Sequence, residues 1–345
     1  MKLLIYVPFL SPRIKYIFNF IFNDILKTEI VFTVNAEEFK QSPLPKFSYA
    51  EQAIQNELFF KSSNLLFERK IIAQKINTVH FGEMRTPFPV TKSTLPFDIF
   101  AASFYFLSRY EEYVPTGNSK EVSYLYKNSL QYKLNLLNQP IIDAWALILK
   151  NILLKHFPTL KFGDKEFSFR PIYILPPSIN PPSKNIISST ILYIKTLIDN
   201  KLSSKNIKIT EIKQIVADMK RHGFIRSPAI SIPDKHHQHH FSGEITLPKS
   251  YIRLTKNKTK NDYSIHYGNC PGFRAGTCTP FYWYDLQLEK TTQLLLHPVV
   301  TTDTALLSNK TTGALLFQIN ELISNVKLVN GDFYFLSLCN DIRPK

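Results

Sequence analysis

The chain of 345 residues is long enough for two domains, and 44% of its residues are hydrophobic, which favours a packed core over disorder. Neither Gly-x-Gly-x-x-Gly nor Gly-Lys-Ser/Thr occurs, which excludes the usual nucleotide-binding fingerprints. The formal net charge of +15 favours anionic partners. Because the lysines are scattered along the whole chain, no specific nucleic-acid surface is predicted.

The cysteine pattern and the N-terminus both indicate a cytoplasmic protein. Three cysteines form neither a Cys-x-x-Cys pair nor an even disulfide framework: Cys270, Cys278 and Cys339. The apolar N-terminus is interrupted by Pro8 and Arg13 and is followed by no small-x-small cleavage site, so it does not match a signal peptide. No stretch reaches the length of a transmembrane helix, and no transmembrane segment is expected.

The first third of the chain alternates short apolar runs with helical periodicity, which is typical of an α/β layer. Residues 3–7 and 29–34 are predicted strands. A helix that starts near residue 13 places apolar side chains at i, i+3, i+4 and i+7 spacing. A second helix over 96–113 is apolar around most of its circumference as far as Arg109, so we expect it to be buried.

Farther along, a predicted helix over 140–157 and a predicted strand over 167–175 precede four prolines between 176 and 182. No regular element crosses such a run of prolines, and we place a domain boundary near residue 165. The remaining predicted elements are helices at 186–200, 209–221 and 312–326 and a strand at 333–338.

Four segments resemble a group of bacterial proteins in which a small domain of unknown role precedes a polysaccharide deacetylase-like barrel of carbohydrate esterase family 4 type. They are Asn-Glu-Leu-Phe at 56–59, the stretch 95–113, Pro-Ile-Ile-Asp-Ala-Trp at 140–145, and the stretch 262–286 with its Gly-Phe-Arg-Ala-Gly. The resemblance implies an α/β protein, with a small N-terminal α/β domain over 1–165. A shortened, deformed, TIM-barrel-like (β/α) barrel is expected over 166–345.

Active relatives, as the resemblance implies, hydrolyse N- or O-acetyl groups on glycans. Their chemistry requires a divalent metal, usually zinc, held by one Asp and two His, with positions open for water and substrate. A second Asp acts as general base on that water, an Arg orients this Asp, and a late His acts as general acid.

Carried onto this chain, the resemblance predicts a degenerate site. Ser178 and Asn180 occupy the positions of the two Asp residues, and neither supplies the charge that a general base or a hard-metal ligand needs. Cys339 stands at the position of the late His, and the His pair of the second motif is not found where the resemblance places it. Only Arg274 is retained. Base, metal ligands and acid are therefore all substituted or deleted, and no cofactor is expected unless the chain is active with zinc.

A run of imidazoles is the strongest remaining chemical signal. Four His surround Gln238, and neutral imidazole suits Zn, Ni and Cu. In an extended segment, His237 and His239 face one side and His236 and His240 face the other. Weak surface metal binding, an inherited structural or sugar-contacting role, and a true metal site all remain open.

A second constellation surrounds the retained arginine. In a functional interpretation, Tyr282, Trp283 and Tyr284 stack on a sugar ring while Arg274 contacts an acidic or hydroxyl group, with Asp285 beside them. In a structural interpretation, Arg274 is buried against a carboxylate and the aromatic side chains belong to the core.

Two smaller features have unremarkable interpretations. A thiol at Cys339 needs a neighbouring base to act as a nucleophile, and a buried Cys is usually inert. Glu111 and Glu112 are adjacent at a helix end and point in different directions, which favours a solvated helix end or a salt bridge between domains.

The expected function is that of a catalytically inactive polysaccharide deacetylase-like protein in cell-surface glycan metabolism, a binding or assembly partner. Its expected ligand is a glycan or anionic polysaccharide, and its protein partner is unknown. One alternative is a metal-dependent glycan deacetylase, a hydrolase of C–N non-peptide or ester bonds, with a relocated His-rich metal site. Another is a protein-interaction module that uses the N-terminal domain.

Overall fold

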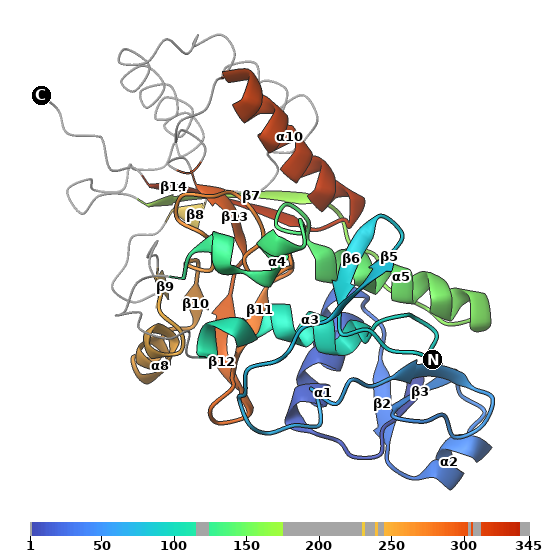
Figure 1. Cartoon of the computed structure of the whole chain (residues 1–345). Helices are drawn as coiled ribbons and strands as arrows, with labels where there is room; N and C mark the ends of the chain where they lie inside the picture. The colour runs from blue at the N-terminus through green and yellow to red at the C-terminus, as the bar shows by residue number, and fades with distance from the viewer. Residues whose placement is uncertain are drawn as a thin grey trace, which may run out of the picture.

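The computed structural model describes residues 2–114, 124–174, 230–231, 239–240, 245–302, 305 and 312–338, and it is a mixed α/β structure (Figure 1). Three four-stranded sheets and one hairpin are formed within these residues. The helices predicted at 186–200 and 209–221 lie outside them. Within the described part of the chain, no helix is both long and apolar enough to cross a membrane.

The N-terminal sheet is entirely parallel, with the strand order β2-β1-β3-β4. Its strands are β1 (Leu3–Tyr6), β2 (Ile30–Thr33), β3 (Lys46–Ala50) and β4 (Leu58–Lys61). The helices in this part are α1 (Pro12–Phe18), the π-helical turn η1 (Asn19–Ile25) and α2 (Ala36–Gln41). The predicted strands at 3–7 and 29–34 and the helix near residue 13 are confirmed.

Local sequence explains where α1 begins. The Ser11 hydroxyl accepts a hydrogen bond from the Ile14 amide, and Pro12 occupies the first turn, where its missing N–H costs nothing. The stripe of apolar residues that predicted the helix is buried, with Ile14 and Ile17 both at 0% exposure. The helix therefore covers the sheet with the face that the periodicity indicated.

The helix α3 (Ile99–Leu107) is capped by Asp98, whose carboxylate accepts from the Ala101 amide, and all of its residues are buried. The prediction of one helix over 96–113 is wrong in extent. Arg109 adopts a left-handed conformation with φ of 54°, which ends the α-helix, and the short 3-10 helix η2 (Tyr110–Tyr113) follows. After this change of direction, Glu112 and Tyr113 contact Arg274 and Trp283 of the C-terminal part.

Short elements connect this layer to the long helix α5 (Ile141–His156), which confirms the prediction for 140–157. They are the hairpin β5 (Thr78–Phe81) and β6 (Met84–Pro87), the 3-10 helix η3 (Tyr126–Asn128) and α4 (Leu130–Lys133).

The remaining two sheets consist mainly of parallel strands. One has the order β13-β14-β7-β8, with β13 (Val299–Thr302), β14 (Asp332–Leu338), β7 (Ser168–Ile174) and β8 (Ile230–Ser231). The other has the order β11-β12-β10-β9, with β11 (Phe281–Asp285), β12 (Lys290–Leu296), β10 (Asn261–Asp262) and β9 (His239–His240). In it, only β11 runs antiparallel to its neighbour.

Two helices accompany these sheets, α8 (Lys249–Lys256) and α10 (Thr312–Leu328). Figure 1 shows α10 beside β14 and β7, at the end of the molecule opposite the N-terminal sheet. No hydrogen-bonded strand pair joins the two C-terminal sheets within the described residues, so the expected closed barrel is not observed there. The α/β class is confirmed, because parallel strands that need crossover connections dominate both parts.

One hydrophobic core runs through both parts of the chain. It includes residues of the N-terminal sheet, of α1, α3 and α5, and of 245–296. The rings of Tyr16 and Tyr284 lie 4.8 Å apart between centroids, and those of Phe20 and Phe281 lie 6.0 Å apart. The division near residue 165 stays a prediction, and a continuous apolar core crosses it.

Buried polar contacts reinforce that core. Asp143 in α5 is fully buried and accepts hydrogen bonds from the Thr277 hydroxyl at 2.6 Å, the Cys278 amide at 3.1 Å and the Thr279 hydroxyl at 2.6 Å. Arg13 in α1 pairs with Glu289 at 2.5 Å. Both contacts join the N-terminal part to a loop or turn beside the C-terminal strands β11 and β12.

The shared core predicts that residues 1–165 do not form a stable unit alone. A fragment of these residues would expose Tyr16, Phe20 and Phe104, which the C-terminal strands cover, and would leave Arg13 and Asp143 without their partners. We expect it to bind the dye ANS strongly and to unfold well below the full chain in thermal denaturation. A fragment as stable as the full chain would instead establish an independent domain.

Candidate functional site

Arg274 lies in a loop whose backbone conformation and close packing require glycine at two positions. Gly272 has a φ of 142°, and a Cβ at this position would lie 2.7 Å from the Leu137 carbonyl oxygen. Gly276 has a φ of 71° and packs against the Phe106 side chain. This close approach to α3 and to the segment before α5 positions Arg274 at the centre of the molecule.

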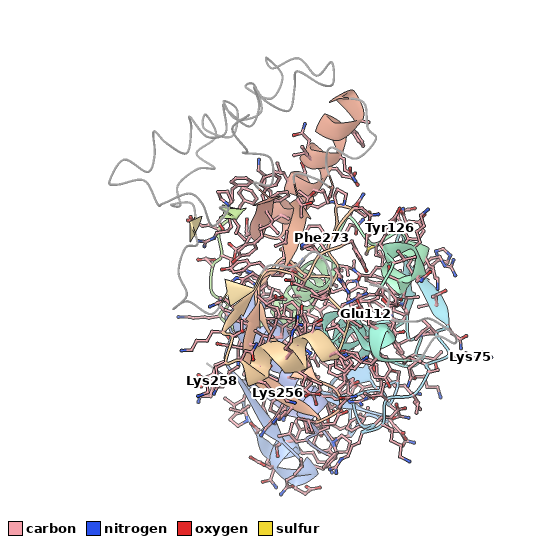
Figure 2. The ribbon with its side chains drawn as sticks, turned by 90° about the vertical axis from the view of Figure 1, so that its left-hand side faces the viewer. Lys75, Glu112, Tyr126, Lys256, Lys258 and Phe273 are labelled. Atoms are coloured by element: carbon pink, nitrogen blue, oxygen red, sulfur yellow. The ribbon has the colours of Figure 1, made fainter. Side chains whose placement is uncertain are left out.

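Arg274 is 2% exposed and forms a two-pronged ion pair with Glu112 of η2. Its Nη2 donates to Oε2 at 2.6 Å, and its Nε donates to Oε1 at 3.1 Å. Its Nη1 donates to the His266 carbonyl oxygen at 3.1 Å. Figure 2 labels Glu112 near the middle of the view, and its side chain is 3% exposed. The fork of a guanidinium matches a carboxylate in this geometry.

A second buried arginine completes the cluster. Arg109 donates from Nε to Glu112 Oε1 at 2.7 Å and from Nη2 to Glu111 Oε1 at 3.0 Å. Its Nη1 donates to Gln131 Oε1 at 2.9 Å and also to the Arg274 carbonyl oxygen. Glu112 therefore bridges two guanidinium groups. We call Arg109, Glu111, Glu112 and Arg274 the arginine–glutamate cluster.

Burial and charge act in opposite directions on the groups of this cluster. Burial raises the pKa of Glu112, but Arg274 and Arg109 outweigh it and hold the pKa below its usual value. For Glu111, burial outweighs the attraction of Arg109, and its pKa is raised. Burial alone would lower the pKa of Arg274, but Glu112 raises it above the usual value. The ion pair between Arg274 and Glu112 is therefore present at neutral pH.

His266 lies directly against this cluster. Its side chain is buried, with 2% of the residue exposed, and neither ring nitrogen has a hydrogen-bond partner among the described residues. Its pKa is lowered to about 4, first because burial penalises the imidazolium and then because Arg274 repels it. The Tyr267 backbone and Asp262 raise it only in part. The imidazole is neutral at pH 7.

The structure does not bring the predicted sugar platform together. Trp283 is 3% exposed and donates from Nε1 to the Tyr113 hydroxyl at 2.9 Å, and Tyr284 is 1% exposed and donates to Glu289 at 2.7 Å. Only Tyr282, at 48%, is exposed. Asp285 accepts from the Gln287 and Leu288 amides in a turn, whereas the carboxylate partner of Arg274 is Glu112. Trp283 and Tyr284 thus belong to the core.

Most of the predicted metal and catalytic positions lie outside the described residues: Ser178, Asn180, His236, His237 and Cys339. His239 and His240 form β9, which pairs with β10 so that His240 is in register with Asp262. Within the part of the chain that the structure describes, no group of three or more His, Cys, Asp or Glu could hold a metal ion.

Of the described cysteines, Cys278 is buried. Its pKa is raised well above the usual value, because burial penalises the thiolate and Asp143 repels it. This thiol is therefore not activated.

Several members of this site carry no sequence signal. Gln131, His266 and Tyr267 are single polar residues in short helices or loops. Tyr267 accepts from Arg109 Nη2 at 3.2 Å through its hydroxyl. Arg109 and Glu112 do stand at i and i+3 spacing, which indicates a local pair. The third partner, Arg274, lies 162 residues beyond Glu112. The sequence offered a buried carboxylate partner for Arg274 and a salt bridge between domains for Glu111 and Glu112, each as one of two interpretations, but it did not pair Arg274 with Glu112.

The comparisons with known proteins cover the N-terminal part. A family model described as a family of unknown function (DUF7033) matches residues 3–158, which lie within the predicted N-terminal domain. No curated protein and no solved structure matches the chain.

Replacement of the bridging carboxylate tests the arginine–glutamate cluster. Glu112→Gln leaves two buried guanidinium groups without their shared anion, and we expect the free energy of unfolding to fall by about 3–5 kcal/mol. Urea denaturation measures the loss. Glu37→Gln, which breaks the exposed pair with Lys40, is the matched control and should change stability by less than about 1 kcal/mol. Equal effects of the two substitutions would contradict the central role of Glu112.

The buried imidazole predicts a pH dependence of stability. His266 binds a proton near pH 6.5 in the unfolded chain but only near pH 4 in the folded chain. Between these two pH values the unfolded state binds more protons than the folded state. The neutral His266 side chain therefore makes its full contribution to the free energy of unfolding above pH 6.5, and up to about 3 kcal/mol is lost as the pH falls. Denaturation of the wild type and of His266→Leu at pH 7.5, 6 and 5 should show a smaller decline in the variant. At pH 7.5 the substitution itself should cost at most about 1.5 kcal/mol of stability. Parallel plots of stability against pH for the two proteins would exclude His266 as the source of the pH dependence.

Proposed function

We propose that this chain is a non-catalytic protein of the polysaccharide deacetylase type, which acts in cell-surface glycan metabolism as a binding or assembly partner. The observation that carries the proposal is the environment of Arg274. The resemblance assigns this residue to orienting a catalytic Asp, yet here it is buried against Glu112 and the His266 carbonyl oxygen. An arginine held in this way joins two parts of the protein.

The strand arrangement supports the same proposal. The strands β13, β14, β7 and β8 are parallel, and so are β9, β10 and β12, as the strands of a (β/α) barrel are. We propose that the C-terminal part is such a barrel in shortened form. Ligands of such folds bind at the carboxyl ends of the strands.

One observation favours a second candidate, a metal-dependent glycan deacetylase. His240 and Asp262 are neighbours in register at the carboxyl ends of β9 and β10. Imidazole and carboxylate at such an edge are the ligand types that zinc uses in hydrolases. This candidate requires the His run to supply further ligands.

Metal binding separates the two candidates. We expect untagged protein to hold zinc and nickel well below one equivalent, and isothermal titration of the metal-free protein to show only weak binding. Acetylated glycans incubated with protein and zinc should release no acetate above background. The variant His236→Ala/His237→Ala/His239→Ala/His240→Ala should behave like the wild type in both measurements.

The control for this experiment replaces two exposed imidazoles elsewhere, His80→Ala and His156→Ala. Tight stoichiometric binding and acetate release that both disappear in the four-His variant, but persist in this control, would establish the hydrolase instead. If the protein is inactive, association with a polysaccharide without turnover is the positive evidence for the proposed function.

A further inference from the structure

The helix α8 is amphipathic, with its apolar side buried against the C-terminal strands. Tyr251 is 0% and Leu254 is 4% exposed, and the Tyr251 ring lies 5.5 Å from that of Trp283 between centroids. Lys249, Arg253 and Lys256 are exposed on the helix. They are spaced at i, i+4 and i+7, so they form one stripe about 10.5 Å long.

The charge continues past the end of the helix. Lys258 and Lys260 are also exposed, and no Asp or Glu occurs between residues 245 and 261. We call Lys249, Arg253, Lys256, Lys258 and Lys260 the α8 basic face. Figure 2 shows Lys256 and Lys258 at its outer side. The face combines five cations with no anion in a segment of 17 residues, in a chain whose basic residues are otherwise scattered.

Three cations of this face have no ion pair among the described residues. Two exposed lysines elsewhere have carboxylate partners: Lys2 pairs with Glu29 at 2.6 Å and Lys40 with Glu37 at 2.8 Å. Among the described residues, Arg253, Lys256 and Lys258 have no carboxylate within ion-pair distance. Like charges this close repel one another, so an anion that binds across them relieves a cost that the free protein carries.

Helix stability alone does not account for the pattern. Cations at the C-terminal end complement the helix dipole, which explains Arg253 and Lys256. Lys249 stands in the first turn, where a cation opposes the helix dipole. Lys258 has a φ of 58°, a conformation that favours Gly or Asn after a helix. Two of the cations thus stand where local structure disfavours them.

We infer that the α8 basic face binds an anionic polysaccharide, one that carries carboxylate, sulfate or phosphate groups along an extended chain. This inference rests on the proposed function and specifies the class of glycan. Four of the five cations are lysines, which act as point charges toward repeated anions without the planar fork that reads a particular group. The charges lie along a helix and the loop after it, which suits a linear polymer.

Two other classes of polyanion fit less well. Single-stranded nucleic acid is usually held by aromatic platforms between the cations, and the one aromatic residue of α8, Tyr251, is buried. A membrane-binding helix inserts its apolar side, but in α8 that side is occupied by the protein core.

The test measures binding of polygalacturonate to the full chain by isothermal titration at several salt concentrations. We expect binding that weakens with salt, and the variant Arg253→Gln/Lys256→Gln/Lys258→Gln should lose about tenfold or more in affinity, because each cation near a polyanion contributes severalfold. The salt dependence should become shallower in the variant.

The matched control is Lys92→Gln/Lys133→Gln/Lys155→Gln. It removes three exposed charges, one at a φ of 56° and two in the last turns of helices. Its net charge and the backbone conformations at its substituted positions therefore match those of the α8 variant. We expect it to retain affinity within about twofold, since these sites lie outside the face. An equal loss in the control would overturn the assignment to α8.

Neutral dextran, a single-stranded oligonucleotide and vesicles of phosphatidylcholine with phosphatidylserine serve as the other probes. Equal or tighter binding of the oligonucleotide or of the vesicles, lost in the α8 variant, would replace the glycan by that polyanion. Binding of dextran alone would overturn this inference but leave the proposed function intact. Acetate release with zinc would overturn the proposed function without deciding what α8 binds.

Discussion

The carboxylate of Glu112, shared between Arg109 and Arg274, is the constraint on which the rest of the structure depends. Two guanidinium groups are buried at the centre of the molecule, and each would be costly there without an anion. Glu112 reaches them because Arg109 turns the chain out of α3. The loop that carries Arg274 can pack against the segment before α5 because Gly272 has no Cβ to clash with the Leu137 carbonyl oxygen. The surrounding aromatic core then excludes water and strengthens the pairs.

This arrangement bears directly on function. In the polysaccharide deacetylase type that we propose for this chain, an arginine in this motif is expected to serve catalysis by orienting a carboxylate. In this protein, Arg274 orients the η2 segment against the C-terminal strands, and the neighbouring imidazole of His266 is neutral and buried. The proposed non-catalytic role follows from that change of partner, because a residue that stabilises the fold is retained whether or not the reaction is.

The proposed glycan function and the α8 basic face address different parts of the molecule. The arginine–glutamate cluster lies in the interior and offers no surface to a polymer, and Trp283 and Tyr284 are core residues rather than a platform. A polysaccharide bound in the proposed function would therefore contact the exterior. The packing of Tyr251 on Trp283 links the two parts, since the aromatic side chain expected to stack on a sugar instead supports the helix that carries the cations.

The sequence by itself determined the elements with strong local signals. The stripe of apolar residues after Ser11 predicted α1, and the periodicity of 140–157 predicted α5. The alternation of short apolar runs with helical periodicity predicted the α/β class. Each of these patterns depends only on residues that are neighbours along the chain. Only the tertiary structure decided the end of α3 at Arg109, the partner of Arg274 and the burial of Trp283. Each of these depends on groups that are distant in sequence and meet in the protein interior. For the two arginines, the cost of burying an unpaired charge selects a carboxylate partner, and no local sequence pattern encodes which carboxylate that is.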